Sequence, residues 1–75
     1  MGLPLRDAKF DSRIAELLAY AAEVFGDEEA ARRWLDTGLW ELENLSPREI
    51  VARNSDSGLQ RARDVLLRIE YGVYS

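Results

Sequence analysis

The sequence has neither cysteine nor histidine among its 75 residues. Without cysteine the chain can form no disulfide and no thiolate metal site, which fits a reducing compartment. Without histidine it lacks the commonest general base and the commonest metal ligand. Lys9 is the only lysine, so a serine or threonine nucleophile has a single lysine that could activate it. These absences argue against an enzyme, and we expect no catalytic residue, cofactor or metal.

Long hydrophobic runs are also missing. The first ten residues, MGLPLRDAKF, lack the apolar core of a signal peptide, and no window approaches the roughly 18 apolar residues of a membrane span. We therefore expect a cytoplasmic protein with no membrane partner. The net charge is −4, with ten acids and five bases in residues 1–45 but four acids and five bases in residues 46–75. Because phosphate backbones favour clustered Lys and Arg, this balance argues against nucleic acid as a partner of this chain alone.

The composition is that of a small globular domain. Apolar residues make up 47% of the chain and charged residues 32%. A domain of this size buries only about 60% of the surface that its unfolded chain exposes, so we expect a single domain of modest stability. Gly2 and Pro4 disfavour an early helix. Residues 1–10 are therefore predicted to be a leader, and residues 11–75 the helical domain.

Hydrophobic periodicity predicts two helices in the first half of the chain. Asp11 or Ser12 can cap the first helix, and its apolar residues recur at spacings of three and four. These residues are Ile14, Leu17, Leu18, Ala21 and Phe25. Gly26 supplies a left-handed stop, and Asp27 is a good N-cap for a second helix. The buried edge of that helix is predicted to comprise Ala30, Ala31, Trp34 and Leu35. A single glycine between the helices predicts an antiparallel or crossed pair.

A loop and a short helix are predicted next. In TGLWELENL, residues 37–45, leucines at helical spacing are interrupted by helix breakers, so we expect a loop with one helical turn. Ser46, Pro47 and Glu49 then form a capping box with proline at the first helical position. The helix that they begin is expected to end near residues 53–54.

The last predicted helix is the most regular and has two apolar faces. It follows a polar connector, NSDSG, in which Asp56 or Ser57 is the expected cap, and Gly72 is expected to end it. Its core stripe comprises Leu59, Ala62, Leu66, Ile69 and Val73, with Val65 beside it. A second set comprises Gln60, Leu67 and Tyr71, flanked by Arg63 and Asp64. At about 100° per residue, this set projects more than a quarter turn away from the core stripe. The whole sequence predicts an all-α fold, a small bundle of about four short helices without strands.

The residues favour recognition of a protein over catalysis or DNA binding. Glu28 with Glu29, and Glu41 with Glu43, are paired carboxylates, but helix-dipole compensation or solvation explains each pair. A helix-turn-helix needs a recognition helix in a basic surround. The predicted helix over residues 47–53 carries only two arginines and follows an acidic segment.

The two-faced last helix is the feature that indicates a protein partner. Leucine and tyrosine beside arginine match the composition of interface hot spots. Alternatively, Leu67 and Tyr71 pack against the leader or the first helix, since a small bundle can bury nearly all its apolar residues. The pattern leaves both interpretations open.

Three segments, taken together, carry a family resemblance. They are AEVFGDEEAARRWLDT at residues 22–37, SPREIV at residues 46–51 and GLQRARDVLLRIEYGVYS at residues 58–75. The chain resembles the toxin-binding domain of the Xre/MbcA/ParS antitoxin family over residues 22–75. In that family a VFGD-type turn enters a helix with a WL pair, and an SP- or TP-led helix precedes a closing helix. The closing helix ends in RIEYGV and an aromatic residue, which is the most specific part of the pattern.

The resemblance implies a cytoplasmic bacterial antitoxin that binds a RES-domain toxin, a class of enzyme that consumes NAD. In the family the closing helix and tail lie against the toxin and obstruct its NAD pocket, and the domain can self-associate. By position, the implied toxin-facing residues are Arg68, Ile69, Glu70, Tyr71, Gly72, Val73, Tyr74 and Ser75. Arg63 and Leu67 join them as predicted partner-binding residues. The implied scaffold comprises Phe25, Gly26, Trp34 and Leu35. The alternative function is a self-association module, or an orphan regulator without a toxin.

The chain departs from the family pattern in two places. Family members usually carry a helix-turn-helix domain ahead of this module, whereas residues 1–21 precede the resemblance here, so we do not expect this chain alone to regulate its operon. The loop also differs, because Gly38 and WELEN stand where the family commonly has a proline and an LGG. Trp40 in this loop is interpreted as a local packing change, with a partner contact as the alternative.

Overall fold

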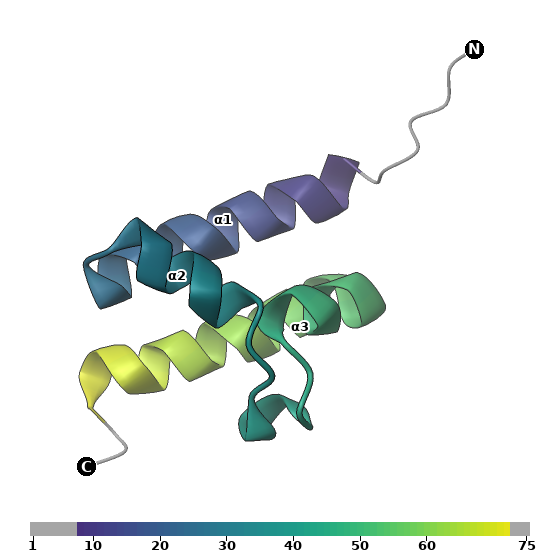
Figure 1. Cartoon of the computed structure of the whole chain (residues 1–75). Coiled ribbons are helices and arrows are strands. Elements are labelled where there is room, and N and C mark those ends of the chain that lie inside the picture. The colour runs from purple at the N-terminus through teal and green to yellow at the C-terminus, as the bar shows by residue number, and fades with distance from the viewer. Residues whose placement is uncertain (1–7, 73–75) are drawn as a thin grey trace.

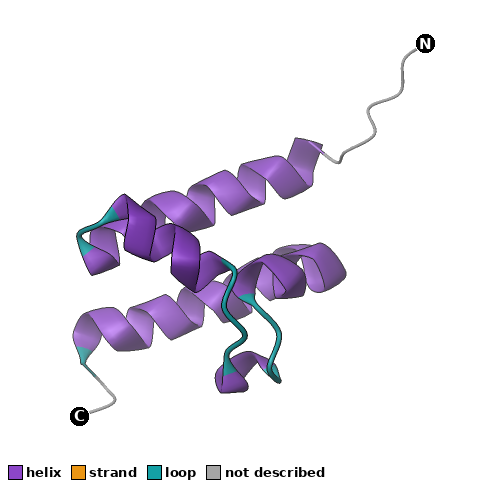
Figure 2. Ribbon diagram, viewed as in Figure 1, coloured by secondary structure: helices purple, strands orange, loops and turns teal. Residues whose placement is uncertain are grey.

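The computed structural model describes residues 8–72, which form helices joined by tight turns (Figure 1). The elements are α1 (Ala8–Phe25), α2 (Glu28–Leu35), the 3-10 turn η1 (Trp40–Leu42) and α3 (Pro47–Tyr71). Within this range there is no strand, as Figure 2 shows, and Leu39 and Leu45 form one isolated antiparallel bridge. The all-α prediction is confirmed, but three α-helices form where about four were expected.

α1 and α2 form the predicted helix pair. α1 begins at Ala8, three residues before the earliest expected cap, and so includes residues 8–10 of the predicted leader. Gly26 ends α1 with a φ of 70°, a conformation that glycine adopts without steric cost. The Asp27 carboxylate then accepts the Glu29 N–H at 3.2 Å and caps α2. Because the turn is so short, α2 runs back across α1 (Figure 1).

The segment between α2 and α3 is a compact loop around η1. The Leu39 N–H donates to the Leu45 carbonyl oxygen at 3.1 Å, and the Asn44 N–H donates to the Leu39 carbonyl oxygen at 2.8 Å. Leu42 is buried, whereas Leu39 and Leu45 are half-buried against the core. The prediction of a loop with one helical turn is therefore confirmed.

The predicted capping box begins α3. The Ser46 hydroxyl accepts the Glu49 N–H at 3.1 Å, and the Glu49 carboxylate accepts the Ser46 N–H at 2.8 Å. Pro47 occupies the first turn, where its missing N–H leaves no hydrogen bond unmade. The start of this helix therefore follows directly from the local sequence.

Ser55 divides α3 into two helical segments, residues 47–54 and residues 56–71. Its φ of 53° and ψ of −121° lie outside the helical region. In a straight helix Ile50 and Gly58 would lie about 12 Å apart. A Cβ on Gly58 would instead collide with the Ile50 carbonyl oxygen and lie 2.7 Å from the Ile50 carbonyl carbon. The second segment therefore folds back on the first, as Figure 1 shows.

The number of helices differs slightly from the expected four, because the predicted third and fourth helices meet at Ser55 without a loop between them. Residues 54–58 complete helical turns on both sides of Ser55, so the predicted third and fourth helices are continuous as one kinked element. The predicted position of the break agrees with the observed kink.

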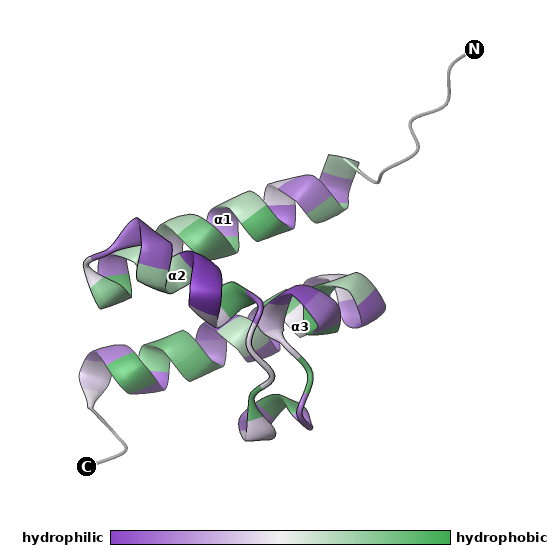
Figure 3. Ribbon diagram, viewed as in Figure 1, coloured by the Kyte–Doolittle hydropathy of each residue, from purple (hydrophilic) through white to green (hydrophobic). Residues whose placement is uncertain are grey.

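The second segment of α3 lies beside α1, and the two run in the same direction. Contacts join Arg13 to Asp56 near their starts and Tyr20 to Glu70 near their ends. Hydrophobic and hydrophilic residues are interspersed on both helices (Figure 3), as expected for amphipathic elements. The core between the helices comprises Ile14, Leu17, Ala21, Ala31, Trp34, Leu35, Leu42, Ile50, Val51, Leu59, Ala62, Val65 and Leu66. In the described residues, no helix combines the length and apolar character that crossing a membrane requires.

Candidate functional site

The second segment of α3 carries an exposed stripe on the side opposite its core face. The exposed stripe comprises Gln60, Leu67 and Tyr71, and the half-buried Asp64 lies between Gln60 and Leu67 on the same side of the helix. Leu67 is 38% exposed and Tyr71 is 73% exposed, whereas Leu66 is fully buried. The prediction of two faces is confirmed, and the interpretation in which α1 buries Leu67 and Tyr71 is wrong.

Arginines lie on both sides of the exposed stripe. On the side toward α1, the exposed Arg63 pairs with Glu16 at 3.0 Å. On the other side, Arg61 donates to the Glu41 carbonyl oxygen at 3.4 Å and so faces η1. Arg68 is exposed and lies seven residues after Arg61, close to the same line along the helix. The two apolar side chains are therefore flanked by positive charge.

The end of α3 brings together most of the remaining predicted contact residues. Gly72 adopts a φ of 69° and ends the helix as expected, with its N–H directed at the carbonyl oxygens of Arg68 and Ile69. Ile69 is half-buried and packs against the core, so its side chain serves the fold as well as any partner. The other predicted contacts, Val73, Tyr74 and Ser75, lie outside the described residues.

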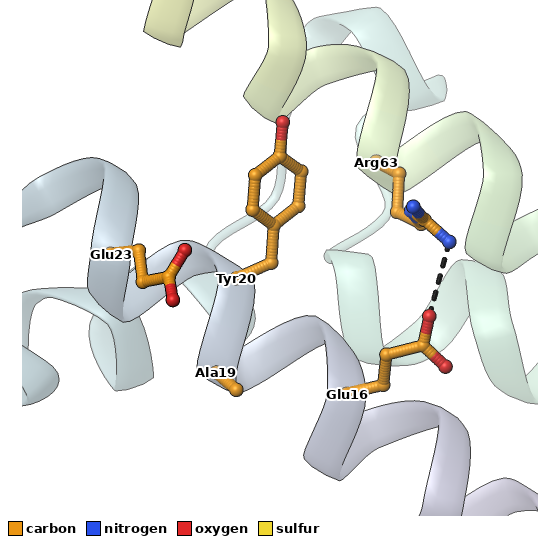
Figure 4. A pocket seen from close by; sticks show the side chains of 5 residues that line it. All are labelled: Glu16, Ala19, Tyr20, Glu23 and Arg63. Atoms are coloured by element: carbon orange, nitrogen blue, oxygen red, sulfur yellow. Dashed lines mark hydrogen bonds and ion pairs between the residues drawn. The ribbon is translucent and has the colours of Figure 1, made fainter.

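Glu70 is exposed but already has a partner inside the chain. Its Oε1 accepts the Tyr20 hydroxyl at 2.8 Å, across the boundary between α3 and α1. This hydrogen bond to Glu70 is the main cause that raises the pKa of Tyr20 above its usual value. An open hollow beside the bond is lined by Glu16, Ala19, Tyr20, Glu23 and Arg63. Figure 4 shows the Tyr20 ring pointing from α1 toward α3.

Tyr20 is the site residue that the sequence prediction missed. It borders the core stripe of α1, and Glu16, Tyr20 and Glu23 recur at spacings of four and three as a polar row beside that stripe. Such a row can indicate the edge of a helix that meets another helix. The partner helix, fifty residues away at Glu70, could not be read from it.

The interpretation of Trp40 as a local packing change is wrong. Its side chain is 77% exposed, although it begins η1 between two leucines that turn inward. The neighbouring residues explain this outcome, because Leu39 and Leu42 occupy the inward positions of the turn. The exposed large apolar side chains of the described chain are Trp40, Leu67 and Tyr71.

The scaffold residues lie where the resemblance implied. Trp34 and Leu35 are buried, and the Phe25 and Trp34 rings pack with their centroids 6.1 Å apart. In the first segment of α3, Arg48 donates to Asp36 at 2.7 Å. This bond lowers the pKa of the Asp36 carboxyl and raises that of the Arg48 guanidinium. Arg48 is one of the two arginines in residues 47–53, the segment weighed above as a DNA-recognition helix, and it is therefore paired with an acidic residue of its own chain.

A small helical domain with one buried face, and with an exposed leucine and tyrosine between arginines on the other, has the composition of a protein-recognition surface. The C-terminal toxin-binding domain of the Xre/MbcA/ParS antitoxins matches residues 21–72, from the end of α1 through α3. The chain therefore belongs to this family, and its class is that of toxin-binding antitoxin domains, which are not enzymes. No curated protein and no solved structure matches the chain.

Proposed function

We propose that the chain neutralises an NAD-consuming RES-domain toxin in the bacterial cytoplasm by direct contact. The contact surface is the exposed stripe of α3 together with the residues that follow Gly72. The observation that carries this proposal is the exposure of Leu67 and Tyr71, 38% and 73%, on a helix whose opposite face is core. The choice of toxin class rests on the resemblance of the closing segment, which in this family obstructs the NAD pocket.

The exposed stripe suits a tight and specific contact. Tyrosine and arginine are enriched among interface hot spots, and Tyr71 has Arg68 within one turn. Leu67 follows the fully buried Leu66 on a helix that packs on the core, so little backbone freedom is lost there on binding. A hot-spot side chain typically contributes at least about 2 kcal/mol, or roughly thirtyfold in affinity.

Titration of the toxin with the purified chain, followed by the loss of NAD, tests the proposal. We expect inhibition to saturate near stoichiometric addition. Tyr71→Asp should abolish inhibition, because it removes the ring and places a carboxylate in the contact, while the circular dichroism spectrum stays helical. The matched control is Ala15→Asp, which adds the same charge to an exposed position of α1. Full toxin activity in an excess of the wild-type chain would refute the proposal.

Removal of Val73, Tyr74 and Ser75 tests the contribution of the tail. We expect the truncated chain to keep its helical content and thermal transition but to lose inhibition. If truncation unfolds the domain instead, these residues belong to the core and the proposed role of the tail is wrong.

Trp40 is proposed as a second contact with the same toxin. Its 77% exposure supports this assignment, as does the attachment of η1 to α3 through Arg61. Trp40→Ala should leave the free energy of unfolding within about 0.5 kcal/mol of wild type, as for other exposed positions. It should weaken inhibition at least several-fold, and unchanged inhibition would exclude the contact.

Self-association is the second candidate function, and the same exposed stripe favours it. A homodimer that buries Leu67 and Tyr71 should appear in sedimentation velocity and become monomeric on Tyr71→Asp. A wild-type chain that sediments as a monomer at the highest attainable concentration would rule it out.

A further inference from the structure

A row of three polar contacts joins α1 to the second segment of α3. This polar seam consists of Arg13 with Asp56 at 2.7 Å, Glu16 with Arg63 at 3.0 Å, and Tyr20 with Glu70 at 2.8 Å. The α3 members are seven residues apart, so they lie along one side of the helix, two turns from one another. Of the three contacts, only the bond between Tyr20 and Glu70 lies in the final turn of α3, which carries the exposed Tyr71.

Among residues 8–72, few buried side chains belong to the final turn of α3. Leu66 is the last fully buried residue of the helix, and Ile69 is only half-buried. Arg68 and Tyr71 are exposed, and Gly72 caps the turn through its backbone N–H. Helix ends fray when apolar contacts are sparse. The bond from Tyr20 is therefore a substantial part of what fixes this turn against α1.

We propose that Tyr20 is a positioning residue for partner binding, because its bond to Glu70 fixes the last turn of α3 and so sets the direction in which Tyr71 projects. This inference rests on the proposed function and deepens it. It also reassigns Glu70, which the family resemblance places in the contact with the toxin. In this chain Glu70 acts first as the acceptor that anchors the last turn.

The place of the Tyr20–Glu70 bond distinguishes a positioning role from an ordinary contribution to the stability of the core. The side chains of Tyr20 and Glu70 meet at the solvent-facing edge of the two helices, not within the core, and the bond spans fifty residues of sequence. Its loss should loosen one helical turn and leave the core intact. Removal of the Tyr20 hydroxyl alone is sufficient to break this bond, since the ring keeps its own contacts when the oxygen is absent.

The experiment has two readouts, amide hydrogen exchange of the free chain and inhibition of the RES-domain toxin. Tyr20→Phe removes only the hydroxyl. We expect faster exchange at residues 69–72 with unchanged exchange in α2, and roughly three- to tenfold weaker inhibition, the scale of one modest hydrogen bond. Glu70→Ala should match it, and Tyr20→Phe should add nothing in the Glu70→Ala background. Glu70→Gln, which keeps an acceptor oxygen, should restore part of the affinity.

Asp56→Asn is the matched control, because it weakens the seam at its other end. It should change neither the exchange of residues 69–72 nor inhibition. Unchanged exchange in Tyr20→Phe overturns the inference, and so does faster exchange with undiminished inhibition. If the wild-type chain leaves the toxin active, the proposed function fails and the positioning role with it. Exchange at the last turn then still reports whether the Tyr20 bond anchors α3.

Discussion

The close approach of Gly58 to the first segment of α3 predicts that Gly58→Ala will destabilise the domain. A Cβ there would collide with the Ile50 carbonyl oxygen and lie 2.7 Å from the Ile50 carbonyl carbon and 3.0 Å from the Val51 Cα. All three are backbone atoms of a helix, so no side-chain rotation can relieve the contact. The two segments of α3 must move apart, and the core that Ile50 and Val51 share with Leu59 must open with them.

The expected cost follows from two opposing effects. Overpacking of this kind costs about 1–3 kcal/mol and sometimes more, and contact with rigid backbone favours the upper part of that range. Replacement of a glycine within a helix by alanine stabilises the helix by about 1 kcal/mol, because alanine has the higher helix propensity. We expect a net loss of about 2 kcal/mol, which in a domain of this size lowers the melting temperature by roughly 8–16 °C.

Thermal and urea unfolding followed by circular dichroism at 222 nm would measure this loss. Arg53→Ala is the control, because it places alanine in the same element at a position where the side chain is exposed. It should change the free energy of unfolding by no more than about 0.5 kcal/mol. A Gly58→Ala variant as stable as wild type would show that the two segments are not packed as described.

Three further predictions concern the kink, the core and pH. Ser55→Gly should raise the free energy of unfolding by about 1 kcal/mol, since glycine accepts a φ of 53° and a ψ of −121° more readily than serine; urea denaturation would detect this, and a loss of stability would contradict it. Leu17→Ala, at a fully buried position of α1, should cost about 2–5 kcal/mol in the same assay, and a cost below 1 kcal/mol would place Leu17 outside the core. The Arg48 bond lowers the pKa of the Asp36 carboxyl in the folded state. The Asp36–Arg48 pair therefore stabilises the fold above the unfolded-state pKa of Asp36, and this stabilisation is lost as pH falls through the folded-state pKa. Asp36→Asn should therefore cost a few tenths of a kcal/mol at pH 7, as expected for an exposed pair, and nothing once the carboxyl is protonated; an equal cost at both pH values would refute this account.

The features that the sequence predicted well are those decided by a few adjacent residues. Gly26 and Asp27 fix the α1–α2 turn because a left-handed stop and an N-cap are local requirements. The capping box of Ser46 and Glu49 is equally local. The division of α3 into core and exposed faces follows from helical periodicity, and it correctly separated Leu67 from Leu66.

The features that the sequence did not predict depend on contacts between distant segments or on rare backbone conformations. A serine with positive φ is uncommon, so nothing in NSDSG distinguished a one-residue reversal at Ser55 from a loop. Trp40 is exposed because Leu39 and Leu42 take the inward positions of the turn. The spacing of these three apolar residues alone could not show which of them would be buried. The bond from Tyr20 to Glu70 requires knowledge of which helices lie side by side.

The reversal at Ser55 has a practical consequence for any binding assay. Because it makes the second segment of α3 run in the same direction as α1, the described chain enters at one end of the helix pair and leaves at the other (Figure 1). An α1 of 18 residues spans about 27 Å. A tag or surface linker placed ahead of Ala8 should therefore stay clear of the exposed stripe. The same tag joined after Ser75 would follow Tyr71 closely in the sequence, and Tyr71 belongs to the surface whose binding is to be measured.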